Sequence, residues 1–210
     1  DELRDECARL IQMAFWSHKK LIALTFRRLG DYIDNLNDPS EYQVDDIDAF
    51  FDVIVGILEG EIEKNSDEAE FVRSLPARLP PNVEDVNHLD VEVLVVDQDI
   101  QTLLLLEQEL RNCGYRVSGA NGFFDGLELA VRTRPDFIVC ASELGELSGA
   151  DMARSIRAIS ATRTIPFIVL TGFSVDHSTL QELPEGTAMV RRGEGFGEDL
   201  ATALQKFRII

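Results

Sequence analysis

The side chains best suited to chemistry stand where apolar runs of the sequence end. Residues 91–96 form a mainly β-branched run that is followed by the carboxylate of Asp97, and residues 165–170 form a similar run followed by Thr171. Such runs are typical of buried strands. Parallel α/β sheets place their functional sites at the carboxyl ends of the strands. The carboxylate of Asp97 is therefore the first candidate for a site.

The histidines and cysteines add little chemistry. The three histidines lie far apart in the sequence and lack the spacing of a zinc site. The three cysteines are odd in number and share no close spacing, which argues against a disulfide framework and favours a reducing, cytoplasmic compartment. We expect no metal site, no cofactor and no enzyme activity. The residues concerned are His18, His88, His177, Cys7, Cys113 and Cys140.

The charge balance limits the classes of partner. The chain has 20 lysine plus arginine and 38 aspartate plus glutamate residues, for a formal net charge of -18. This field repels a phosphate backbone, so we expect no nucleic-acid binding. Apolar runs stay shorter than the ~18 residues that span a bilayer. The first residue is Asp1 rather than Met, and we expect a fragment of a longer protein or a processed product.

The second half of the chain alternates strand patterns with helix patterns. Such alternation predicts a doubly wound α/β fold with a five-stranded parallel sheet. Strands are expected at residues 91–97, 115–120, 136–141, 165–171 and 187–192, and helices at 101–112, 123–132, 150–159, 179–183 and 198–206.

Three motifs in this half carry a resemblance to a known family. They are Leu94-Val95-Val96-Asp97, Pro135-Asp136-Phe137-Ile138-Val139, and Ile165-Pro166-Phe167-Ile168-Val169-Leu170-Thr171. In this order and spacing, residues 91–210 resemble the CheY-like receiver domain of response regulators, which has a flavodoxin-like fold. The resemblance implies a role in two-component signalling.

The resemblance also implies a phosphorylation site that is broken here. In the family, paired acids after the first strand hold Mg²⁺, and an aspartate at the end of the third strand accepts the phosphoryl group. Asp97 matches the first acid, whereas Gln98 replaces the second and Ala141 replaces the acceptor. An alanine has no oxygen that could form an acyl phosphate. Glu143, in the loop after the third strand, is an alternative source of fixed negative charge near the pocket.

The remaining family positions are mixed. A threonine or serine and a lysine contact the phosphoryl oxygens in the family. Thr171 matches the hydroxyl, but the lysine position falls on Gly193, or on Arg192 with a one-residue slip. The resemblance is therefore to a pseudo-receiver that cannot be phosphorylated in the usual way.

A receiver without this chemistry can still offer surfaces to partners. In the family, the fourth helix, fifth strand and fifth helix form such a face. In this chain that face would include Val190, Arg191, Arg192, Phe196 and the last helix. The expected partners are signalling proteins, namely a histidine kinase, a response regulator or an output protein.

The first half reads as an all-α helical hairpin. Helices are expected at residues 2–29, or as far as 36, and at 41–64. We place a hairpin domain at residues 1–75, a proline-containing linker at 76–90 and the receiver-like domain at 91–210. Two helices rarely make a stable core, so we expect a homodimeric four-helix bundle. The alternative is packing of the first helix on its own C-terminal domain. The expected interface residues are Phe15, Trp16, Ile22, Phe50, Ile54 and Ile57.

The hairpin also resembles, weakly, the dimerisation and phosphotransfer domain of histidine kinases. Ser17-His18 matches that family's Ser-His pair, but Lys19 and Ala23 depart from the acid and the proline that follow it. The helical period places His18 on the apolar side, which favours a packed histidine over a phosphoacceptor.

These features favour a non-catalytic signalling adaptor that combines a dimerising hairpin with a degenerate receiver. Two alternatives stay open. One is a phosphorelay intermediate with His18 as phosphoacceptor. The other is a regulatory fragment of a larger histidine kinase or transcription factor.

Overall fold

The structure is a computed structural model that describes residues 9–10, 20–33, 41–62, 67–77, 90–172, 183–193 and 196–207. The chain divides into two compact units, residues 1–78 and 79–210. Among the described residues, no helix is both long and apolar enough to cross a bilayer. Each unit is considered by itself below.

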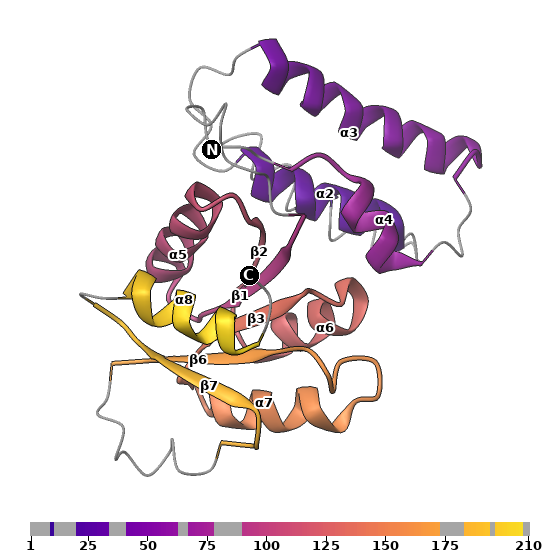
Figure 1. The fold of residues 1–210 in the computed structure, drawn as a ribbon. Coiled ribbons are helices and arrows are strands. Elements are labelled where there is room, and N and C mark those ends of the chain that lie inside the picture. Colours follow the sequence, from indigo (N-terminus) through magenta and orange to yellow (C-terminus); the bar gives the residue numbers. More distant parts are fainter. Residues whose placement is uncertain are drawn as a thin grey trace. The chain divides into compact units, whose positions relative to one another are not determined.

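The second unit contains the predicted five-stranded parallel sheet. Its strands are β1 (Glu92–Val96), β2 (Arg116–Ala120), β3 (Phe137–Ala141), β6 (Phe167–Thr171) and β7 (Thr187–Arg191). They lie in the order β2-β1-β3-β6-β7 (Figure 1). Every pairing is parallel, which confirms the predicted fold class.

Helices cover both faces of this sheet. Helices α5 and α8 lie on one face, and α6 and α7 lie on the other (Figure 1). Their bounds are α5 (Ile100–Asn112), α6 (Phe123–Thr133), α7 (Gly149–Ala158) and α8 (Phe196–Lys206). The short helix expected at residues 179–183 falls almost wholly outside the described residues.

The core of this unit is built from the three central strands. Every residue of β1, β3 and β6 is buried, as expected for strands with helices on both sides. Phe137 of β3 packs edge-on against Tyr115, with 5.6 Å between the ring centroids. Edge strand β7 instead alternates between buried and exposed side chains. This packing explains why residues 91–97 and 165–171 read as continuous apolar runs.

A small hairpin after β3 was absent from the sequence prediction. It consists of β4 (Glu143–Leu144) and β5 (Leu147–Ser148), which pair antiparallel. Its turn contains Gly145 at φ 81°, a conformation that favours glycine. Ser148 then caps helix α7: its hydroxyl accepts a hydrogen bond from the Asp151 amide at 3.1 Å. The hairpin thus leads the chain directly into the next helix.

The first unit has three helices among its described residues: α2 (Lys20–Ile33), α3 (Glu41–Glu59) and α4 (Glu68–Ser74). Helix α2 contacts both α3 and α4. Tyr32 of α2 packs edge-on against Phe50 of α3, with 5.6 Å between the ring centroids. The Tyr32 hydroxyl also donates a hydrogen bond to Asp46 at 2.5 Å.

Two features of this unit differ from the prediction. Helix α3 ends at Glu59 rather than at residue 64, because Gly60 takes φ 86° and its amide bonds back to the Gly56 carbonyl at 3.1 Å. Helix α4 was not predicted; Asp67 caps it by accepting hydrogen bonds from two backbone amides. This third helix packs against α2 and adds the buried residues Ala69, Phe71 and Val72 to the unit.

The expected dimer residues lie in the protomer's own core where the structure describes them. Ile22, Phe50, Ile54 and Ile57 are all buried within the single chain. Phe15 and Trp16 lie outside the described residues. These four residues are therefore not available as a dimer interface. The four-helix bundle itself stays a prediction, and it would have to use other residues.

Gly149 gives a direct test of the packing that follows β3. A Cβ atom at this position would lie 2.3 Å from the backbone oxygen of Ala141, which cannot move aside cheaply. We expect Gly149→Ala to reduce the free energy of unfolding by about 1–3 kcal/mol. Gly172→Ala is the matched control, because its Cβ would meet nothing within 4 Å. Calorimetry of the full chain measures both, and equal melting temperatures would contradict the close approach.

Candidate functional site

The carboxyl edge of the sheet gathers the residues that the sequence singled out. Asp97 follows β1, Ala141 is the last residue of β3, Thr171 is the last residue of β6, and Arg192 follows β7. Because all strands run parallel, these four positions share one edge. The edge is therefore the candidate functional site.

Asp97 is a buried carboxylate with two different partners. It is 3% exposed. Its Oδ1 accepts a hydrogen bond from the Asp99 amide at 3.0 Å, and its Oδ2 forms a short ion pair with the Arg192 guanidinium. A carboxylate buried without a cation or donors would be strongly unfavourable. The two contacts satisfy both oxygens inside the protein.

The ion pair crosses the sheet. Asp97 and Arg192 are 95 residues apart in the chain, and two strands, β3 and β6, lie between the strands that they follow. Neighbouring strands are about 4.8 Å apart, so the two loops and the long arginine side chain together close the gap. The Arg192 amide donates a hydrogen bond to the Thr171 carbonyl at 3.0 Å, and this bond holds the backbone of Arg192 beside the end of β6.

The strands crossed by the ion pair end on small or buried side chains. Ala141 ends β3 with only a methyl group, and Thr171 ends β6 with 1% exposure. The neighbouring Cys140 thiol is fully buried, and burial together with the Asp97 charge raises its pKa. A protonated, buried thiol is a poor nucleophile. The edge thus holds no activated nucleophile among these residues.

The loops around the edge are held by local hydrogen bonds. Asp99 caps α5 by accepting a hydrogen bond from the Thr102 amide at 2.7 Å, and this bond lowers the pKa of the Asp99 carboxyl. The side chain of Gln98 lies against Gly145, since a Cβ there would be 3.2 Å from its Oε1. Gly193 is exposed at φ 121°. Glu143 is exposed on the hairpin after β3.

The donor set does not fit a magnesium ion. A hard cation needs several oxygen ligands, with carboxylates foremost. Asp97 is the one carboxylate that the family pattern retains here, and both of its oxygens are already bound by Arg192 and Asp99. Over the described part of the chain, no group of three or more histidine, cysteine or acidic side chains could hold a metal.

The predicted interaction face needs one correction. Val190 is 1% exposed and belongs to the core cluster, because β7 alternates and this residue points inward. Arg191 is exposed, and Phe196 is half-buried against the same core. Arg192 is 36% exposed in its side chain while it holds Asp97. The exposed part of this face is therefore Arg191, with Arg192 and Phe196 at its border.

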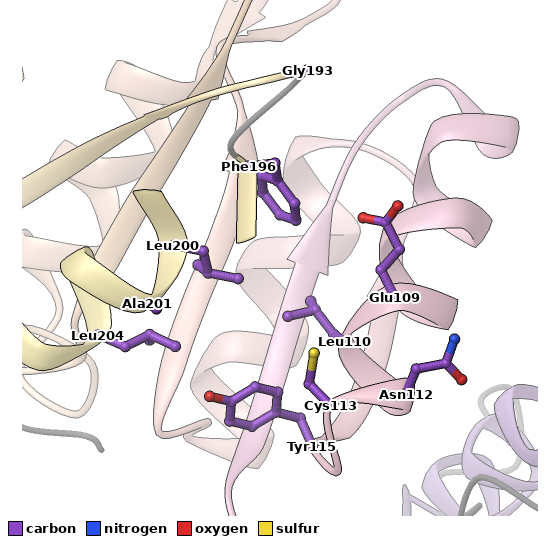
Figure 2. Close-up of a pocket in the computed structure, with 10 residues that line it drawn as sticks. All are labelled: Glu109, Leu110, Asn112, Cys113, Tyr115, Gly193, Phe196, Leu200, Ala201 and Leu204. Carbon is purple, nitrogen blue, oxygen red and sulfur yellow. The ribbon is translucent and has the colours of Figure 1, made fainter. Parts of the chain in front are cut away.

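An apolar cavity of about 520 Å³ lies on the α5 and α8 side of the sheet (Figure 2). The side chains of Leu110, Tyr115 and Leu200 line it, and the exposed free thiol of Cys113 stands at its wall. Burial raises the pKa of the Tyr115 phenol. Neither residue of the ion pair lines it, but Gly193, which directly follows Arg192, does.

His18, His88, His177 and Cys7 lie outside the described residues, so the structure does not test the phosphoacceptor hypothesis. The sequence analysis missed the pairing of Asp97 with Arg192. The only hint in the sequence was the type of two residues, an acid and an arginine, at the ends of two predicted strands. No local pattern connects positions so far apart.

Comparison with known proteins agrees with the fold. Residues 93–189 match the family described as response regulator receiver domain. The transcriptional regulatory protein ZraR of Klebsiella oxytoca is 30% identical over 96 residues, which cover 46% of this chain and 21% of ZraR. The transcriptional regulatory protein PrrA of Mycobacterium leprae is 38% identical over 82 residues, covering 39% of this chain and 34% of PrrA. The chain thus spans about a fifth to a third of these relatives.

Solved structures show the same fold. The receiver domain of a sensor histidine kinase from Pseudomonas aeruginosa aligns with a TM-score of 0.50 and 24% identity, covering 56% of this chain and 98% of that domain. That domain carries a magnesium ion coordinated in its active-site cleft. At this identity the likeness establishes the fold alone.

The ion pair predicts unequal effects for two adjacent arginines. Arg192→Ala leaves the buried Asp97 carboxylate without its cation, and we expect a loss of about 1–3 kcal/mol of unfolding free energy, less than for a fully buried pair because Arg192 is partly exposed. Arg191→Ala, the matched control, should cost less than about 0.5 kcal/mol. Urea unfolding at pH 7 measures both.

A double-mutant cycle with Asp97→Asn isolates the pair. We expect a coupling energy of at least about 1 kcal/mol between positions 97 and 192. A coupling near zero, or equal losses for the two arginine variants, would show that the contact does not hold the edge together.

The helix cap after the hairpin predicts a pH dependence. Hydrogen bonds from Ser148, and one from Arg154, lower the pKa of Asp151 to about 2. The ionised carboxylate therefore stabilises the fold fully above its ordinary pKa, about 3.9, and this contribution fades as the pH falls toward 2. Asp151→Asn should cost about 1 kcal/mol at pH 7, and its difference from wild type should shrink below pH of about 4. Thermal melts across this range measure it.

The control for this prediction is Glu128→Gln, which removes an i,i+4 ion pair between an exposed Glu128 and a half-buried Arg132. We expect it to cost less than about 0.5 kcal/mol at pH 7. If the Asp151→Asn deficit stayed constant down to pH 2, the cap would not depend on the charge of Asp151.

Proposed function

Because residues 93–189 form a response regulator receiver domain, we propose that this chain is a two-component signalling adaptor whose receiver takes no phosphoryl group. In this proposal the domain signals through protein contacts rather than through its own chemistry. It is not an enzyme, and it uses neither Mg²⁺ nor another cofactor.

One observation carries the proposal. The ion pair between Asp97 and Arg192 spans the carboxyl edge, and β3, which lies between the two residues, ends in Ala141. Ala141 offers no oxygen to a phosphoryl group. Each Asp97 oxygen already has a partner, the Asp99 amide for Oδ1 and Arg192 for Oδ2, and a metal ion would have to compete with the Arg192 cation. The positive charge that a phosphoryl group would need is already neutralised within the protein.

The rest of the receiver keeps what a contact surface needs. The sheet and its helices retain a fully buried core, so exposed side chains are held on a rigid scaffold. Arg191 is an exposed cation in a chain of net charge -18, and it suits an acidic partner surface. In this proposal the surface is available to its partner without phosphorylation.

Intact-mass spectrometry tests the proposal. We expect no phosphoryl adduct after incubation with Mg²⁺ and acetyl phosphate, nor with a phosphorylated histidine kinase as donor. A parallel variant that restores the acids, Gln98→Asp with Ala141→Asp, asks whether the missing oxygens account for this. An adduct on the variant alone supports the proposal.

An adduct on the wild-type chain would contradict it, and its position would identify the chemistry. An acid-labile adduct on His18 would establish a phosphorelay intermediate. An adduct on an acidic side chain would establish an active receiver with an unusual acceptor.

A second candidate follows from the relatives themselves. ZraR and PrrA are transcriptional regulators of which this chain matches a part. On this ground the chain would be the regulatory part of a longer regulator whose output domain controls transcription. Sequencing the complete reading frame tests this candidate, and a frame that encodes no output domain would reject it.

A further inference from the structure

Helix α3 carries apolar side chains that its own unit leaves uncovered. Val44, Phe51, Val55 and Leu58 are 43%, 44%, 48% and 57% exposed, respectively. The residues between them include Phe50, Ile54 and Ile57, which are buried, so α3 has one covered and one open apolar face. Single exposed apolar residues are common, but a connected set indicates a contact surface.

The four residues line one side of the helix. Their spacing of seven, four and three residues repeats the helical period, so their side chains project in nearly the same direction. From Val44 to Leu58 the strip runs for about 21 Å at 1.5 Å per residue. We call these four residues the α3 strip. Its length matches about four turns of a second helix.

An acidic strip runs beside the apolar one. Asp45, Asp48, Asp52 and Glu59 are all exposed and lie along one flank of the α3 strip. The helix contains six acidic residues and no basic residue. A partner that covers the strip must therefore meet a row of negative charge along that flank.

We propose that the α3 strip is a docking site for a basic amphipathic helix of another protein. Its apolar residues would cover Val44, Phe51, Val55 and Leu58, and a row of lysine or arginine beside them would meet the acidic flank. Helix packing of this kind uses anchors at i, i+3, i+4 and i+7, and Phe51, Val55 and Leu58 present the i, i+4 and i+7 positions.

The charges favour this occupant over a second copy of the chain. Two α3 helices packed on each other would bring the acidic flanks of both near the same interface, with no basic residue on either helix to offset them. The net charge of -18 opposes self-association further. A basic helix would instead be attracted both by the acidic flank and by the negative net charge of the chain.

The proposal deepens the adaptor function, and rests on it, by naming the class of partner that the first unit takes. Its geometry is independent of the receiver's carboxyl edge. A phosphoryl adduct on the receiver would end the adaptor proposal and leave docking on α3 intact, so the two can fail separately.

The test measures binding of a labelled peptide to the full chain by fluorescence anisotropy. The probe is a synthetic helix of about four turns with leucine along one strip and lysine along the adjacent strip. A second peptide replaces each lysine with glutamate. We expect saturable binding of the lysine peptide, weakened when salt is raised above about 0.15 M, and no binding of the glutamate peptide.

Two surface variants locate the site. Phe51→Ser with Val55→Ser removes the apolar contact, and Asp48→Lys with Asp52→Lys reverses the acidic flank. We expect each to raise the Kd of the lysine peptide at least about tenfold. All four side chains are exposed, so both variants should fold; far-UV circular dichroism and thermal unfolding check this.

Matched controls lie in the second unit. Glu198→Lys with Asp199→Lys makes the same change of net charge on helix α8, where both residues are exposed. Leu105→Ser removes an exposed apolar side chain from α5, where it is 56% exposed. We expect both controls to keep the Kd within about twofold of wild type.

Any one of four results would overturn the proposal. The lysine peptide fails to bind, or the glutamate peptide binds as tightly. The controls weaken binding as much as the α3 variants do, which would indicate general attraction to an acidic chain. Sedimentation shows a dimer that Phe51→Ser with Val55→Ser converts to monomer, which would make a second copy the occupant.

Discussion

The ion pair between Asp97 and Arg192 is the contact on which the carboxyl edge of the receiver unit depends. A carboxylate buried to 3% exposure requires a cation and hydrogen-bond donors, and Arg192 and the Asp99 amide supply them. Through this one contact the loop after β1 and the loop after β7 are held together across β3 and β6. The Asp99 amide that binds Asp97 belongs to the residue that also caps α5, so the same loop serves the buried charge and the start of the helix.

The receiver fold is stabilised by the packing of its core rather than by the side chains at its carboxyl edge. The central strands are buried by helices on both faces, and the apolar side chains of those strands supply the stability. Ala141 at the end of β3 carries no charge, so it adds no repulsion to that of the Asp97 carboxylate. The single Arg192 cation is therefore enough to neutralise the buried negative charge of Asp97.

The first unit shows how the same amphipathic helix can serve two purposes. One side of α3 is covered by the unit's own residues, with Phe50 packed on Tyr32, and the neighbouring side leaves the α3 strip open. The added helix α4 and the burial of Ile22, Ile54 and Ile57 complete a core within one chain. The apolar surface that remains is bordered by negative charge, which selects a partner by sign as well as by shape.

The sequence by itself determined the five parallel strands and the four helices that the structure describes in the second unit, because buried strands and amphipathic helices leave a local period that can be read directly. It also located Asp97, Ala141 and Thr171 at strand ends. Where the prediction of local elements was wrong, as at Gly60 and in helix α4, short-range capping had been overlooked. Tertiary structure alone decided that Arg192 pairs with Asp97, that Val190 faces the core, and which side of α3 stays open. Those outcomes depend on contacts between segments far apart in the chain, and a helical period marks apolar positions without saying which of them a neighbour will cover.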